Sequence, residues 1–318
     1  MDDIKYSFII PCYKSSQTIT NVIELTIEEI RQMNNENFEF ILVNDCSPDH
    51  NETINVLKKL AEKYSFVKVI DLAINTGQHN AIMAGLNYAE GEIMIGMDDD
   101  GQTHPSQLTK LFSELEKGYD IVYGYYPEKK HNIFRRIGSF FNQLSVKILV
   151  KKPNHLKTSS YWVIKRFIRD NIIKYESSHT YLQGLFLRTT KNIASVSIEH
   201  FEREYGTSNY NFKTLLKLWS NIIGFSVVPL RLSTYLGYLF ALGGFAGGIF
   251  VFIQKLRKPH MAMGWPSTMV AIFIFSGLIL LFLGLIGEYT GRMFLAQNRE
   301  PQYVVKEKIN FDEGEEKR

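Results

Sequence analysis

The sequence predicts an α/β fold with a mostly parallel sheet, followed by a pair of membrane-spanning helices. Up to about residue 125, short β-rich runs alternate with segments of helical period, and near the other end two long stretches contain no charged side chain. Strands that alternate with crossover helices form parallel sheets, and such sheets bind ligands beyond the carboxyl ends of their strands.

Five short runs rich in β-branched and aromatic residues are the predicted strands. They cover residues 6–10, 38–43, 67–70, 93–97 and 121–123. Between them, segments such as 18–33 and 54–64 carry apolar residues near the helical period. Polar clusters follow the runs at residues 11–14, 44–49, 75–80 and 98–100. We therefore expect these clusters to meet at one edge of the sheet.

Three consecutive aspartates, Asp98, Asp99 and Asp100, follow the fourth run and precede a turn at Gly101. Carboxylates at positions i and i+2 can bind Mg²⁺ or Mn²⁺, which complete their shells with water and phosphate oxygens. A single Asp-x-Asp is more often a solvated acidic turn, but its place at a strand end favours a metal site. The dinucleotide-binding and P-loop glycine motifs are absent, so a diphosphate would depend on the metal and on side chains.

The charge-free stretches predict two transmembrane helices. The chain has 318 residues, a net charge of +3 and 45% apolar residues, and it lacks charged side chains from Leu232 to Gln254 and from Met261 to Gly287. Each stretch reaches the roughly 20 residues that span a bilayer as helix. We expect spans at about 232–254 and 264–288, within residues 232–290; a buried core helix is the alternative. Their glycines permit a homo-oligomer without requiring one.

The flanking segments complete the predicted organisation. Apolar residues at helical spacing in 213–231 predict an amphipathic juxtamembrane helix, with packing against the preceding domain as the alternative. Residues 1–212 show no signal segment, and an even number of spans places both ends on one side. We expect a multi-pass protein of the inner or plasma membrane with residues 1–212 and the tail 291–318 in the cytosol. The tail is expected to be an extended segment that becomes disordered. No nucleic-acid partner is expected.

Five segments, taken in order, resemble the motif set of family 2 glycosyltransferases. They are Ile9–Tyr13, Val43–Asp49, Asn75–Gln78, Met97–Gln102 and Arg203–Tyr210. Within that family the chain is similar to polyisoprenyl-phosphate glycosyltransferases, such as bactoprenol glucosyltransferases and dolichyl-phosphate mannose synthases, from about residue 5 to 230 and on into the paired spans. The resemblance implies a GT-A fold for residues 1–212 and inverting transfer from a nucleotide sugar, with UDP-glucose expected. It also implies a polyprenyl phosphate acceptor and Mg²⁺ or Mn²⁺ as cofactor.

The same resemblance implies roles for residues by position. Pro11, Tyr13, Asp45, Gly77, Gln78, Asp98 and Asp99 would bind the nucleotide sugar, and Asp100 and Asp98 would bind the metal. Arg203, with Asp98 and Asp100, would be catalytic, and Arg203, Ser208, Arg135 and Arg136 would hold the acceptor phosphate. Arg135 and Arg136 read equally well as solvated surface residues.

Two positions depart from the family pattern. Gln78 stands where many relatives have a lysine, and Ser160 lies where many show the aspartate of a Gly-Asp-Phe-Arg motif that is often invoked as the base. A lipid monophosphate, with a second pKa of about 6, needs no base, whereas an alcohol acceptor does. The substitution therefore favours a phosphate acceptor; a carboxylate from elsewhere in the chain that serves as the base is the alternative. A processive polysaccharide synthase and a non-catalytic membrane scaffold remain as alternatives.

Overall fold

The structure, a computed structural model, describes residues 4–33, 36–127, 153, 155–199, 228–257, 264–298 and 300–311. It divides into two compact units. The first comprises Met1–Asn221 together with Glu300–Arg318, and the second comprises Ile222–Arg299.

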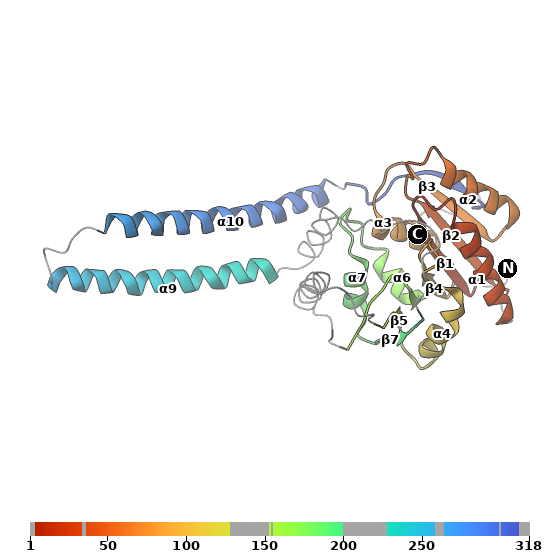
Figure 1. The fold of residues 1–318 in the computed structure, drawn as a ribbon, viewed down its shortest axis with the longest axis horizontal. Coiled ribbons are helices and arrows are strands. Elements are labelled where there is room, and N and C mark those ends of the chain that lie inside the picture. The colour runs from red at the N-terminus through yellow and green to blue at the C-terminus, as the bar shows by residue number, and fades with distance from the viewer. Residues whose placement is uncertain are drawn as a thin grey trace. The chain divides into compact units, whose positions relative to one another are not determined.

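A single mostly parallel sheet organises the first unit, as the sequence predicts (Figure 1). Its strands lie in the order β7-β5-β6-β4-β1-β2-β3-β8, with β6 and β8 antiparallel to their neighbours and the others parallel. The bounds are β1 (Tyr6–Cys12), β2 (Phe38–Asn44), β3 (Val67–Leu72), β4 (Ile93–Gly96), β5 (Ile121–Tyr125), β6 (Trp162–Lys165), β7 (Ile193–Ser197) and β8 (Val305–Ile309).

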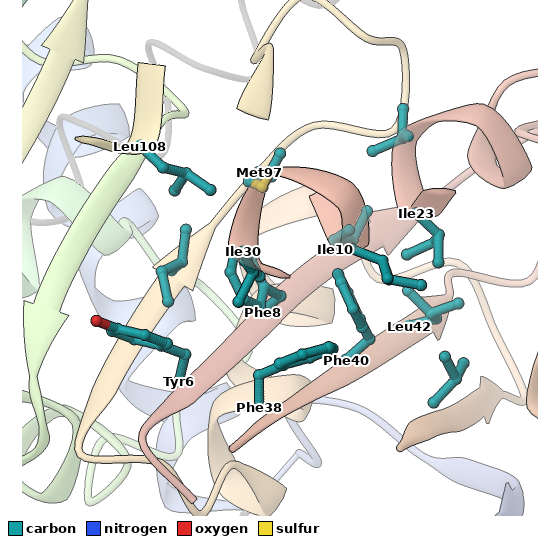
Figure 2. Packing of buried hydrophobic residues seen from close by; sticks show 14 of the residues in the cluster. Tyr6, Phe8, Ile10, Ile23, Ile30, Phe38, Phe40, Leu42, Met97 and Leu108 are labelled. Atoms are coloured by element: carbon teal, nitrogen blue, oxygen red, sulfur yellow. The ribbon is translucent and has the colours of Figure 1, made fainter. Parts of the chain in front are cut away.

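Helices cover both faces of this sheet. On one face α1 (Ile19–Gln32), α2 (Glu52–Lys63) and α4 (Leu108–Glu116) pack against Phe8, Ile10 and Phe40, which are fully buried (Figure 2). The other face carries α3 (Gln78–Tyr88), α6 (Arg166–Ile172) and α7 (Leu182–Thr189). Ile9 points to this second face, where a Cβ at Gly85 of α3 would lie 2.6 Å from its Cγ2 atom. Burial on both faces explains why the central strands are mostly apolar.

The strand order places a topological switch point beside β1. From β1 the chain adds β2 and β3 on one side, and it then returns to place β4 on the other side of β1. The connections that follow β1 and β4 therefore leave the sheet in diverging directions. In open α/β sheets, ligands bind in the crevice at this point.

The second unit consists of two long helices, α9 (Val228–Arg257) and α10 (Trp265–Gln297), that contact one another. Within the part of the chain that the structure describes, the segment Ile274–Gly291 is long and apolar enough to cross a membrane, with a mean hydropathy of 1.7 over 18 residues. Its side chains are not buried: Leu280, for example, is 68% exposed. Helix α10 also continues past the predicted end of the second span.

The expected extended tail is partly ordered: residues 291–297 belong to α10, and the extended segment that follows includes the strand β8. Residues 300–311 return to the first unit, and β8 pairs with the edge of β3. The Asn310 side chain donates to the backbone carbonyls of Ala61 and Val67 at 2.7 and 2.9 Å. The alternating charges of Val-Lys-Glu-Lys-Ile are typical of an edge strand that faces water on one side. A disordered segment has a similar polar composition, so composition alone does not distinguish the two.

Candidate active site

The aspartate triplet lies at the switch point, directly after β4. Gly101 has a φ of 77°, which lets the chain turn back sharply after Asp100. The Thr103 hydroxyl accepts a hydrogen bond from the Asp98 amide at 2.9 Å, and the Asp100 carboxylate accepts one from the Gln102 amide at 3.0 Å. The turn is thus held by its own polar groups, and all three aspartates remain partly exposed.

Asp98 is held from two sides. The Gln78 amide, at the start of α3, donates to Asp98 Oδ1 at 2.9 Å, and the Ser160 hydroxyl, just before β6, donates to Asp98 Oδ2. Burial raises the pKa of Asp98 to about 7; the Ser160 hydrogen bond opposes the shift, and the charges of Asp100 and Asp99 add to it. Gln78 and Ser160, the two positions singled out in the sequence, therefore meet at one carboxylate.

Asp99 faces the loop that follows β1. Its carboxylate accepts hydrogen bonds from the Tyr13 amide, at 3.2 Å, and from the Ser15 hydroxyl, and Ser15 in turn donates its amide to Thr53 Oγ1 at 3.0 Å. Burial raises the pKa of Asp99, and these two hydrogen bonds lower it. Asp99 therefore ties the β1 and β4 loops together across the switch point. Sequence reasoning missed Ser15, which is only 2% exposed and has no motif of its own.

Asp45, at the end of β2, organises the neighbouring loop. It is 3% exposed, and its carboxylate accepts hydrogen bonds from the amides of Thr76 and Gly77 at 2.7 and 2.8 Å and from the Thr76 hydroxyl at 3.1 Å. Gly77 has a φ of 84°, a conformation that side chains disfavour. Asp45 thus shapes the loop that leads to Gln78.

The residues predicted to bind the base differ in how far their side chains are exposed. Pro11 is buried within β1, where it pairs with Val43, whereas Tyr13 at the strand end is 43% exposed. An exposed aromatic ring at the end of β1 can stack on a base. Contacts of Pro11, Tyr13 and Asp45 with a base stay predictions.

Tyr126 is a second residue that sequence reasoning missed. Its hydroxyl donates to the Gln102 carbonyl at 2.7 Å, so it reaches the aspartate turn from the end of β5. Burial raises its pKa, and the nearby charges of Asp98 and Asp100 raise it further. The available signal was its position three residues after the predicted strand 121–123.

The carboxylates fit a divalent cation. Each oxygen of Asp98 accepts one hydrogen bond, and a carboxylate offers about four lone-pair sites, so Asp98 retains capacity for a metal. Asp100 lies two residues on, whereas Asp99 is engaged with the β1 loop. Within the described ranges, no group of three His, Cys, Asp or Glu residues is arranged to hold a metal. Two carboxylates are what Mg²⁺ commonly uses when substrate phosphates and water complete its shell.

The predicted acceptor residues cannot be placed. Arg135, Arg136, Arg203 and Ser208 lie outside the described residues, and so does most of the predicted juxtamembrane segment. Their roles at the acceptor phosphate stay predictions.

Comparison with known proteins identifies the family of the chain. The model for "Glycosyl transferase family 2" matches residues 7–179. The uncharacterized glycosyltransferase YkcC of Bacillus subtilis is 29% identical over 97% of this chain and 95% of its own length. The undecaprenyl-phosphate 4-deoxy-4-formamido-L-arabinose transferase of Proteus mirabilis is 28% identical over 96% of this chain and 94% of its own.

Among solved structures, the chain resembles glucosyl-3-phosphoglycerate synthase of Mycobacterium tuberculosis. The TM-score is 0.50 at 16% identity, over 70% of this chain and 79% of that one. This likeness concerns the fold, which is that of a GT-A-like α/β domain. The chain belongs to glycosyl transferase family 2 and is a glycosyltransferase.

Proposed function

We propose that this protein transfers a sugar from a nucleoside diphosphate sugar to a polyprenyl phosphate, in a single inverting displacement at the cytosolic face of a membrane. The observation that carries the proposal is the pair Asp98 and Asp100 at the switch point of a family 2 chain. A near full-length relative whose name states an undecaprenyl-phosphate acceptor supports the acceptor class.

In this proposal, the described residues bind and orient the donor diphosphate. Asp98 and Asp100 would hold Mg²⁺ or Mn²⁺, which would neutralise the charge that develops on the departing nucleoside diphosphate. Asp99 and Asp45 fix the two loops on either side. Tyr13 offers an exposed ring to the base. Each residue binds or orients, and none is required to remove a proton from the acceptor.

The contacts of Ser160 support a phosphate acceptor. Position 160 carries a hydroxyl that donates to Asp98, and it therefore supplies no carboxylate that could act as a base there. An acceptor phosphate is largely ionised at neutral pH and attacks the anomeric carbon without a general base. Arg203, Ser208, Arg135 and Arg136 are the proposed phosphate contacts.

For the donor we propose UDP-glucose, and the relatives favour a second candidate. The Proteus mirabilis protein is named for 4-deoxy-4-formamido-L-arabinose, a pentose derivative that lacks the hydroxymethyl group of glucose. A nucleotide-activated form of that sugar therefore belongs in the same donor panel.

The long apolar helices supply the membrane contact in this proposal. Ile274–Gly291 of α10 has the length and composition of a span, and the charge-free stretch from Leu232 to Gln254 falls within α9. We propose that both cross the membrane as a hairpin. Both ends of the hairpin would then lie on the cytosolic side with the first unit.

The test is a transfer assay with the purified full-length chain, the donor panel and Mg²⁺ or Mn²⁺, with and without polyprenyl phosphate. Release of nucleoside diphosphate that depends on the lipid, together with a product of one sugar on the lipid phosphate, is the expected result. Formation of polymer would instead support a processive synthase. Absence of turnover with every donor, in protein that is folded, would support a non-catalytic scaffold.

A further inference from the structure

The segment that follows α10 contacts the loops beside the aspartate site as well as the sheet edge. Gln302 is 5% exposed, and its side-chain amide donates to Thr180 Oγ1 at 2.6 Å and to the Ser177 carbonyl at 3.2 Å. Two residues earlier, the Glu300 carboxylate accepts a hydrogen bond from the Ser178 hydroxyl at 2.8 Å. Neither Gln302 nor Glu300 belongs to β8, so covering the edge of β3 does not explain these contacts.

The loop that they hold is joined to the start of α3. The Asn80 side chain, 7% exposed, donates to the Ser178 carbonyl at 2.8 Å and to the Thr76 carbonyl at 3.2 Å. Thr76 and the next residue, Gly77, are those whose amides bind Asp45. A continuous chain of hydrogen bonds therefore runs from Gln302 through residues 177–180 and Asn80 to the Asp45 loop.

A second contact from the segment that follows α10 reaches the start of the loop that connects β3 with α3. The Val304 carbonyl accepts a hydrogen bond from the Ala73 amide at 2.8 Å, directly after β3 ends. Residues 73–80 are thus held at their beginning by Val304 and at their end by Asn80. Gln78, which donates to Asp98, lies within this stretch.

We propose that residues 300–304 position the donor-binding loop, with Gln302 as the main positioning residue. Hydrogen bonds between buried polar groups are costly to break, because each lost partner leaves a desolvated donor or acceptor. Loss of the Gln302 contacts would free residues 177–180, remove the fixed acceptor of Asn80 and loosen the loop that presents Gly77 and Gln78. The role of this loop in donor binding rests on the proposed function. The mechanical link, which is the chain of hydrogen bonds from Gln302 to residues 73–80, does not.

The mechanical link is tested by hydrogen exchange on the full-length chain. Gln302→Ala should accelerate exchange of the amides of residues 76–81 about tenfold, with little change in β1 and β2. Glu307→Gln is the matched control, since Glu307 lies in β8 of the same segment and its side chain forms a surface ion pair with Lys58 at 2.8 Å. It should leave residues 76–81 unchanged.

A second pair of variants tests the link at its other partner, independently of Gln302 and of any damage that its replacement does to folding. Thr180→Val removes the hydroxyl that accepts from Gln302, whereas Thr180→Ser keeps it. Thr180→Val should reproduce the faster exchange at residues 76–81, and Thr180→Ser should not. Unchanged exchange there in both Gln302→Ala and Thr180→Val would overturn the proposal, and so would a uniform acceleration that includes β1 and β2.

The functional consequence is measured on the same proteins. Gln302→Ala should weaken UDP binding three- to tenfold and raise KM for the donor by a similar factor, with kcat at saturating donor close to wild type. Unaltered UDP affinity would overturn the donor role. A wild-type protein that binds no nucleoside diphosphate would refute the proposed function instead, and the exchange result would still decide the link itself.

Discussion

The Ser160 hydroxyl donates a hydrogen bond to the Asp98 carboxylate, although the two residues are 62 positions apart in the chain. Strand β6 runs antiparallel to β4, so its first residues meet the last residues of β4 at the same edge of the sheet. Ser160 and Gln78 thus hold opposite oxygens of one carboxylate. A carboxylate held in this way presents its remaining lone pairs in a fixed direction.

Asp100→Asn should lower turnover by several orders of magnitude while the protein stays folded. The asparagine side chain keeps an oxygen that can accept from the Gln102 amide, so the turn survives. It removes the negative charge that a divalent cation requires. The checks are single-turnover transfer with Mn²⁺ and the thermal unfolding midpoint. Near wild-type transfer at ordinary metal concentrations would refute the role of Asp100.

Asp99→Asn gives a contrast at the neighbouring position. Asp99 binds the Tyr13 amide and the Ser15 hydroxyl, so a neutral amide should weaken the β1 loop through loss of charge-assisted hydrogen bonds. We expect weaker donor binding and a lower unfolding midpoint, with the metal dependence of turnover retained. A metal requirement altered as strongly as in Asp100→Asn would contradict this division of roles.

Ser160→Ala should raise the Mn²⁺ concentration that gives half-maximal activity. A hydrogen bond to a charged group contributes about 1.5–3 kcal/mol, which corresponds to roughly ten- to a hundredfold in a binding constant. Gln78→Ala should act in the same direction through the other oxygen. Because both hold one carboxylate, the double variant should deviate from the sum of the single effects. Strict additivity, or direct Mn²⁺ binding equal to wild type, would show that the two contacts do not orient the ligand.

The central strands could be predicted because they are buried on both faces and their sequences are mostly apolar. The predicted run 38–43 becomes β2 (Phe38–Asn44), for example, and 67–70 becomes β3 (Val67–Leu72). Strand β8 could not be predicted, because the alternating charges of its sequence are as typical of a disordered, solvated segment as of an edge strand. It forms through contacts such as that of Asn310 with Val67, 243 residues away.

The site likewise contains residues whose positions could be predicted from the sequence and one, Ser160, whose position could not. The aspartates, Asp45 and Gln78 all follow parallel strands or begin the next helix, so the rule that parallel strands share a carboxyl edge brings them together. Ser160 precedes an antiparallel strand whose direction depends on its partner. Its contact with Asp98 therefore required the tertiary fold.

His79 should make stability depend on pH in mildly acidic solution. Its ring keeps part of its surface exposed, but the Nδ1 atom is buried, and burial lowers the pKa to about 4. The unfolded chain, with a histidine pKa of about 6.5, binds the proton more readily. The contribution of neutral His79 to the free energy of unfolding is therefore fully present above about pH 6.5. It is lost as the pH falls towards 4, by at most about 1.4 kcal/mol per pH unit.

The measurement for His79 is the unfolding midpoint of wild type and His79→Gln between pH 7 and pH 4.5. Glutamine does not titrate, so the difference between the two proteins should change across this range even though other groups also titrate. Parallel curves would show that His79 is not held in its neutral form.

The proposed hairpin predicts which cysteines an impermeant reagent can reach. Residue 260 lies between the two proposed spans, and both native cysteines belong to the first unit, where Cys12 is buried and Cys46 is partly exposed. In intact cells, a membrane-impermeant maleimide should label His260→Cys and leave the wild type unlabelled. After permeabilisation Cys46 should react, since a partly exposed thiol is accessible once the reagent enters. Labelling of Cys46 in intact cells would place the first unit outside, because two spans put both ends of the hairpin on one side of the membrane.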